Sequence, residues 1–278
     1  MVSPGTGRDA ERSAPAAADI PSSPPAAQEP DDGPEPGDVP HTTELRERLT
    51  SNLARHEVRH HPLDGRRHAA VGVVVIDSDR DEHGDDPTEF DRAALVANIP
   101  GVDVDTLTGR VDGTAGGSAV ILTRRGSGLN DHANQWALPG GRVDPDESAF
   151  EAAVREIREE IGLEVDETDL LGRLDDYPTR SGYVITPFVF WARGGHEPVG
   201  NPDEVASVHR ISLRELTRSD SPRFVTIPES DRPVIQIPVG GDLIHAPTGA
   251  VLYQFRAVAF DGHPTRVDGY EQPLFAWR

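Results

Sequence analysis

The sequence contains no cysteine and no lysine. Without a thiol, it cannot form disulfides, thiolate nucleophiles, iron–sulfur clusters or cysteine-based zinc sites. Without a lysine ammonium group, a P-loop, a Schiff-base enzyme and a protein-kinase active site are excluded as well. Arginine is therefore the only strong side-chain cation that can hold a phosphate group.

Positive charge and long apolar runs are also scarce. The formal net charge is −21 over 278 residues, which repels a nucleic-acid backbone and argues against binding to a duplex. No apolar run approaches the length of a membrane span, and the basic-then-apolar order of a secretion signal is missing. We therefore expect a cytoplasmic protein without a membrane partner, with a small anionic molecule as its ligand and a homodimer as one option.

Composition divides the chain into a tail and a body. Residues 1–42 are rich in Pro, Ala, Ser, Gly and Asp, and such a segment buries too little apolar surface to offset its ordering entropy. We expect a disordered tail there and a single domain over residues 43–278, which is long enough to bury a good core. Leu45, Leu49 and Leu53 share one helical face, so the domain is predicted to begin with a helix within residues 43–62.

The end of that helix contains His56-Glu57-Val58-Arg59-His60, which matches the H-E-x-x-H pattern of zinc proteases. Three fixed letters are a weak signal, and a zinc site needs a further ligand and a cleft. We interpret the segment as a polar helix end beside the turn at Pro62.

The remaining periodicity predicts an α/β protein with a loop insertion. The acidic segment 77–86 lacks the glycine and the terminal glutamate of a calcium loop and is interpreted as a solvated loop. Residues 89–99 are expected to form a short helix, and residues 100–117 a loop insertion between core strands. Strands are expected at 69–76, 118–125, 183–192 and 204–211, a hairpin at 234–239 and 243–245, and helices at 212–216 and 251–259.

A second strong helix signal lies in residues 141–163. Asp144, followed by a proline and with Glu147 three positions on, predicts a helix start at Asp144. Gly162 is expected to end this helix. A buried stripe is predicted from the four apolar residues at helical spacing, Phe150, Val154, Ile157 and Ile161.

Glu156, Glu159 and Glu160 lie on another side of the same helix. Carboxylates at this spacing repel one another, and a hard divalent cation removes that cost while bridging to phosphate. A glutamate cluster alone is typical of a solvated helix face. In combination with the flanking glycines and Arg155, it indicates a metal–phosphate site.

Residues 141–163 match, position for position, the signature G-x5-E-x7-R-E-U-x-E-E-x-G-U, in which U is a bulky aliphatic residue. The chain therefore resembles the Nudix hydrolase family. The resemblance implies a Nudix-type α/β/α sandwich with a mixed sheet, and Mg²⁺- or Mn²⁺-dependent hydrolysis of a nucleoside diphosphate linked to a further group. It also implies residue roles: the Gly141 carbonyl and Glu156, Glu159 and Glu160 as metal ligands, Arg155 and Glu147 as braces of the helix, and Glu159 as general base, with Glu204 as the alternative.

The flanks of this stretch bear on the substrate. Residues 121–141 keep the spacing of the motif L-L-T-x-R-[SA]-x3-R-x3-G-x3-F-P-G-G, which is typical of coenzyme A diphosphatases, although Gly126, Asn130, Asn134 and Leu138 depart from it. Residues 171–187 resemble the same subfamily. On this resemblance, Arg125 and Arg180 are candidate phosphate clamps.

Three hypotheses follow. The first is a coenzyme A diphosphatase, the type of enzyme that the chain resembles most. The second is another Nudix hydrolase, acting on ADP-ribose, NADH, a sugar nucleotide or an oxidised nucleotide; its sequence would differ from that of the first only outside residues 141–163. A non-catalytic nucleotide-binding module is the third, and the complete set of acidic residues argues against it.

Overall fold

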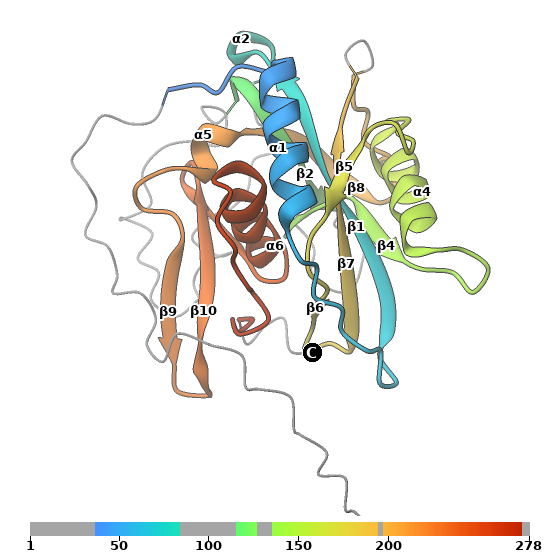
Figure 1. Ribbon diagram of the computed structural model, residues 1–278, viewed down its shortest axis with the longest axis vertical. Helices are drawn as coiled ribbons and strands as arrows, with labels where there is room; N and C mark the ends of the chain where they lie inside the picture. Colours follow the sequence, from blue (N-terminus) through green and yellow to red (C-terminus); the bar gives the residue numbers. More distant parts are fainter. Residues whose placement is uncertain (1–36, 84–114, 127–134, 194–196, 274–278) are drawn as a thin grey trace, which may run out of the picture.

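The computed structural model describes residues 37–83, 115–126, 135–193 and 197–273 (Figure 1). The predicted helix at 89–99, nearly all of the insertion at 100–117, and Asn130 and Asn134 lie outside these ranges. Most of the expected tail lies outside them too.

Strand β1 (Arg67–Ser78) is the centre of the main sheet. Its valine-rich middle is buried on both faces, as the continuous apolar run predicted. It pairs antiparallel with β2 (Gly117–Arg125) and β4 (Gly140–Arg142), and parallel with β7 (Tyr183–Trp191). The predicted mixed sheet is therefore confirmed.

Four short or peripheral strands complete this eight-stranded sheet. Antiparallel partners of β2 are β3 (Trp136–Ala137) and β8 (Val205–Ser212). Antiparallel partners of β7 are β5 (Leu170–Arg173) and β6 (Tyr177–Pro178).

A second, three-stranded antiparallel sheet follows in the chain. It consists of β9 (Arg223–Ile227), β10 (Ser230–Val239) and β11 (Asp242–His245), with β10 in the middle. The predicted hairpin is β10–β11, whereas β9 was not predicted. A bulge between Ser230 and Val234 interrupts its pairing with β10, and its burial is too irregular to give a clear alternating pattern.

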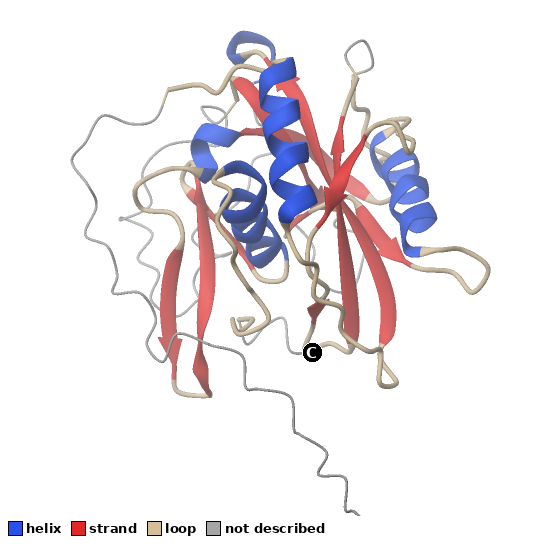
Figure 2. Ribbon diagram, in the orientation of Figure 1, coloured by secondary structure: helices blue, strands red, loops and turns tan. Residues whose placement is uncertain are grey.

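Helices cover both faces of the main sheet (Figures 1 and 2). On one face, α4 (Ala149–Ile161) packs with Ala70, Val74 and Phe190. On the other, α1 (Thr43–Arg55) and α6 (Thr248–Gln254) with its π-helical continuation η3 (Phe255–Phe260) share a core with Val73 and Val75. The three-layer arrangement is as predicted. The short helices are α2 (Arg80–His83) and α5 (Leu213–Leu216).

The segment before α1 packs on the sheet, although the sequence assigned it to the tail. The Val39 carbonyl accepts a hydrogen bond from the Ser118 amide at 2.6 Å. The His41 ring stacks on Trp191, with 4.0 Å between centroids. These contacts, together with the ion pair of Asp38 with Arg80 at 2.6 Å, order a stretch whose composition alone predicts disorder.

Helix α1 buries Leu45, Leu49 and Leu53 as predicted, but it ends at Arg55. His56 is its C-cap, and His56 Nε2 lies 2.9 Å from Asp175 Oδ1, where both side chains are buried. The His60 side chain is 67% exposed. His56 to His60 therefore lie beyond the helix. The two histidines share no helix face, and the prediction that this segment forms a polar helix end is wrong. In the part of the chain that the structure describes, no helix is both long and apolar enough to span a membrane.

Candidate active site

The helix that carries the glutamates begins later than predicted. Ser148 is the N-cap of α4: Ser148 Oγ accepts from the Glu151 amide at 3.2 Å, and Glu151 Oε2 accepts from the Ser148 amide at 2.7 Å. This is a complete capping box. The predicted start at Asp144 is wrong, because the Asp144 amide bonds to Glu147 Oε1 within a turn and only one half of a box forms there.

The rest of α4 follows the sequence pattern. Ile157 and Ile161 are fully buried, while Phe150 and Val154 are half-buried against the same core. Gly162 ends the helix in the left-handed conformation at φ 66°, as predicted from its lack of a side chain.

Two glycines allow the glutamates to approach the backbone of β4. A Cβ atom on Gly141 would lie 2.2 Å from Glu156 Oε1, and one on Gly140 would lie 2.4 Å from the Ala70 carbonyl oxygen. The Gly140 amide donates to Glu160 Oε2 at 3.3 Å. A larger residue at Gly141 would push α4 away from β4, and one at Gly140 would push β4 away from β1.

Arg155 gathers the acidic side chains on the solvent side of α4. Its guanidinium donates to both oxygens of Glu147 at 2.7 and 3.1 Å, to Glu156 Oε1 at 2.9 Å and to Glu159 Oε2 at 3.0 Å. It also donates to the Arg142 carbonyl at 3.0 Å. These contacts join the turn before α4 to the helix. Arg155 and Glu147 therefore lie where the role expected of them, to brace the helix, places them.

Glu160 is the most perturbed carboxyl group of the cluster. Burial and, next, the charge of Glu156 raise the pKa of Glu160 to about 7, while the Gly140 amide and Arg125 oppose this rise. Burial also raises the pKa of Glu156, and Glu204 adds to the rise in both groups. Burial, more than the neighbouring negative charges, therefore disfavours the ionised form of both groups.

Arg125, the last residue of β2, and Glu204, directly before β8, also act on this site. The Gly126 amide donates to the Glu204 carbonyl at 2.9 Å, which holds the start of β8 beside the end of β2. Both side chains act electrostatically on Glu160. Two residues that the sequence singled out separately are therefore brought together with the glutamates of α4.

The donor atoms suit a hard divalent cation. Among the residues that the structure describes, no three His, Asp or Glu side chains converge as a ready-made cation site; Glu156 and Glu159 hold Arg155 instead. Carboxylate oxygens are nevertheless the ligands that Mg²⁺ and Mn²⁺ prefer. The site offers two such groups, the half-buried carboxylate of Glu160 and the carboxylate of Glu156 against Gly141. Binding such an ion would offset the burial and the repulsion that raise both pKa values.

Arg180 does not lie with this cluster. Its guanidinium is paired with Glu271, with Nε to Oε1 at 3.1 Å, and it lines a separate cavity with residues of the C-terminal segment. Sequence reasoning missed Glu271, since nothing local in the sequence signals an ion pair with a residue 91 positions away. It also missed the Ser148 cap, although the S-x-x-E spacing was visible.

Comparison with known proteins gives a consistent result. Residues 110–229 match the family model described as NUDIX domain. A Nudix hydrolase named NudL from Yersinia enterocolitica, described as uncharacterized, is 39% identical over 100 residues, covering 36% of this chain and 51% of the relative. NudL from Yersinia pestis is 39% identical over 97 residues, covering 34% and 49%. The matched segment thus spans about half the length of these curated relatives.

Solved structures with a similar fold include a MutT/nudix family protein from Enterococcus faecalis, at 16% identity and a TM-score of 0.41, covering 78% of this chain and 68% of that one. An Ap4A hydrolase from C. elegans has 16% identity and a TM-score of 0.33, covering 55% and 86%.

Proposed function

We propose that this chain, which belongs to the Nudix family over residues 110–229, hydrolyses the diphosphate linkage of a nucleotide derivative with the help of Mg²⁺ or Mn²⁺. The observation that carries the proposal is the half-buried Glu160 carboxyl group, whose pKa is raised to about 7 beside a glycine-lined approach to Glu156. Perturbed carboxyl groups of this kind are typical of functional sites.

The proposed ligands of the metal are the carboxylates of Glu156, Glu159 and Glu160, together with the Gly141 carbonyl. When bound, the metal would supply positive charge for the phosphate oxygens and lower the pKa of water. Arg125 lies close enough to act on the charge of Glu160, so it is the proposed partner for a phosphate oxygen of the substrate.

The general base takes a proton from the water that attacks phosphorus. Glu159 is the proposed base, since its side chain is 47% exposed on the same helix and can meet water. Its Oε2 already accepts a hydrogen bond from Arg155, so this oxygen is not open to the attacking water. Glu204 is therefore the alternative, because it is close enough to Glu156 and Glu160 to influence both.

The favoured substrate is coenzyme A or a derivative of it, on the resemblance of residues 121–141 and 171–187. The test is to incubate the purified chain with Mg²⁺ or Mn²⁺ and coenzyme A, ADP-ribose, NADH, a sugar nucleotide and an oxidised nucleoside triphosphate. We expect coenzyme A to yield an adenosine bisphosphate and phosphopantetheine. Turnover of another compound alone would replace the substrate assignment, and tight binding of one without turnover of any would indicate a regulatory module.

The histidines near α1 provide a negative control. His56→Ala together with His60→Ala is expected to leave the rate of hydrolysis per folded molecule unchanged. The pair should still lower stability by about 1–3 kcal/mol, because Asp175 loses a buried hydrogen-bond partner. Thermal melting and initial rates on the same samples check this. A large loss of rate at full folding would revive a zinc site.

A further inference from the structure

Positive charge gathers at one end of the main sheet, although the chain as a whole carries −21. Arg142, next to Gly141, donates through Nε to the Tyr183 hydroxyl at 2.9 Å. The Arg67 guanidinium lies over the same ring, 3.9 Å from its centroid. Arg66 directly precedes Arg67 in the chain. These arginines lead from the glutamate site along the sheet, and we call Arg142, Arg67 and Arg66 the arginine track.

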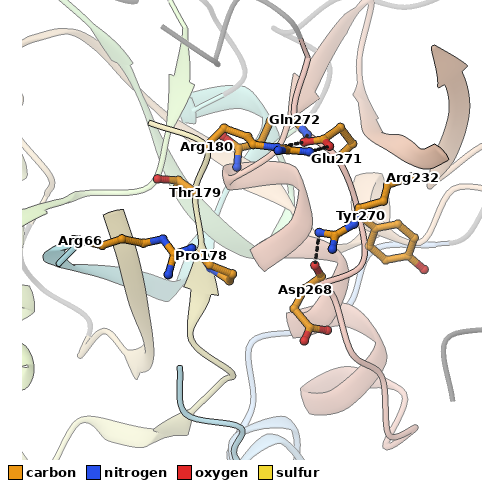
Figure 3. A pocket seen from close by; sticks show the side chains of 9 residues that line it. All are labelled: Arg66, Pro178, Thr179, Arg180, Arg232, Asp268, Tyr270, Glu271 and Gln272. Carbon is orange, nitrogen blue, oxygen red and sulfur yellow. Dashed lines mark hydrogen bonds and ion pairs between the residues drawn. The ribbon is translucent and has the colours of Figure 1, made fainter. Parts of the chain in front are cut away.

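The track ends at a cavity of about 290 Å³. Figure 3 shows the cavity between the turn that follows β6 and the C-terminal segment, with Arg66 on one side and Arg232 on the other. Pro178 and Tyr270 add less polar wall surface. Arg66, Arg232 and Tyr270 lie outside residues 110–229, so segments beyond the matched domain build much of this cavity.

The acidic groups of the cavity are already neutralised. Glu271 is paired with Arg180, Nε to Oε1 at 3.1 Å. Asp268 is paired with Arg59 at 2.8 Å. Arg66 and Arg232 are exposed and form no ion pair with a residue that the structure describes. The cavity therefore has two uncompensated guanidinium groups, which favour a doubly charged anion with oxygen acceptors.

The strand register relates the cavity to the glutamate site. Arg142 is opposite Ala69, Ala69 is opposite Ile185, and Ile185 is opposite Tyr177. Three strand spacings separate Arg142 from Tyr177, or roughly 14 Å. Pro178, the next residue, lines the cavity. In coenzyme A the phosphomonoester is on the ribose that carries the diphosphate, so the long side chains of Arg66 and Arg232 have to span the rest of this distance.

We propose that Arg66 and Arg232 bind a phosphomonoester group of the substrate, remote from the diphosphate that is cleaved. The inference rests on the proposed function and narrows it to nucleotides that carry such an additional phosphate. Arg180 is a positioning residue, because its ion pair with the buried Glu271 holds the C-terminal segment against the turn. Within the arginine track, Arg142 and Arg67 lower the electrostatic cost of bringing a highly charged anion to an acidic protein.

A matched pair of substrates tests the proposal. Coenzyme A and 3′-dephospho-coenzyme A differ only in one phosphomonoester, so kcat and KM are measured for both with the wild type and with Arg66→Gln/Arg232→Gln. We expect the double variant to raise KM for coenzyme A about 10- to 100-fold at unchanged kcat, and to change either constant for the dephosphorylated compound less than about twofold. Arg48→Gln/Arg55→Gln, which removes the same two positive charges from exposed positions of α1, should leave all four constants unchanged. An equal effect on both substrates, or no effect, overturns the proposal.

A binding experiment separates this proposal from the proposed function. Adenosine 3′,5′-bisphosphate and AMP are titrated calorimetrically into the metal-free chain. We expect the wild type to bind the bisphosphate at least about tenfold more tightly than AMP, and the double variant to lose this preference. If coenzyme A is not hydrolysed but the preference and its loss are observed, the substrate assignment fails and the phosphate site stands. Equal affinities for the two nucleotides in the wild type overturn the phosphate site, whatever the enzyme hydrolyses.

Discussion

Glu160→Gln is expected to lower kcat by about 10³-fold or more without unfolding the protein. The glutamine removes a negative charge from the proposed metal site, and a loss of this size is usual when a main electrostatic stabiliser of the transition state is removed. The fold should survive, because a glutamine oxygen can still accept the hydrogen bond from the Gly140 amide. The measurement is kcat at saturating Mg²⁺ with whichever substrate of the panel is hydrolysed, alongside a thermal melt.

Glu164→Gln is the matched control. Glu164 is exposed just beyond the end of α4, so the same chemical change there should leave kcat at the wild-type value. Wild-type rates from Glu160→Gln would rule out its assignment as a metal ligand.

Glu159→Gln and Glu204→Gln distinguish the two candidate bases. The base is the residue whose variant loses rate while retaining metal affinity, and an unchanged rate in both variants would exclude both.

An element could be predicted from the sequence where the contacts that determine it are made by residues close to it in the chain. The continuous apolar run of β1 has only one stable arrangement, a strand covered on both faces, and the structure has it. The start of α4 was misplaced because two capping patterns overlap within eight residues, and the choice between them depends on Arg155, which holds the Glu147 carboxylate in the turn.

Long-range ion pairs were beyond sequence reasoning. Arg124, beside the predicted clamp Arg125, is almost fully buried and pairs with Asp242 at 2.8 Å. Asp242 also accepts from Trp136 Nε1 at 3.0 Å. The second sheet therefore supports the strands that lead into Gly140 and Gly141. An ion pair between residues 118 positions apart leaves no periodic signal in the sequence. The residue type alone also does not tell whether an arginine beside a motif is buried or exposed.

In the absence of metal, Glu160→Gln is expected to be more stable than the wild type at pH 8 and equally stable near pH 4. The pKa of Glu160 is about 7 in the folded protein against an ordinary value of 4.5. The folded state therefore holds the proton more tightly than the unfolded state does. Stability from this group is fully present below pH 4.5 and is lost as the pH rises through 7. At about 1.4 kcal/mol for each tenfold change in proton affinity, the loss is at most about 3 kcal/mol, and solvent contact of the side chain reduces it.

Urea unfolding of both proteins between pH 4 and pH 8, with a chelator present, measures this difference; urea carries no charge and leaves the electrostatics intact. Addition of Mg²⁺ or Mn²⁺ at about 100 times its dissociation constant should stabilise the wild type by about 2.7 kcal/mol at pH 8. The variant should gain much less, so the wild type recovers most of the difference in stability. The opposite result, a wild type whose stability relative to the variant does not fall between pH 5 and pH 8, would mean that Glu160 is not held in the repulsive environment that a divalent cation relieves.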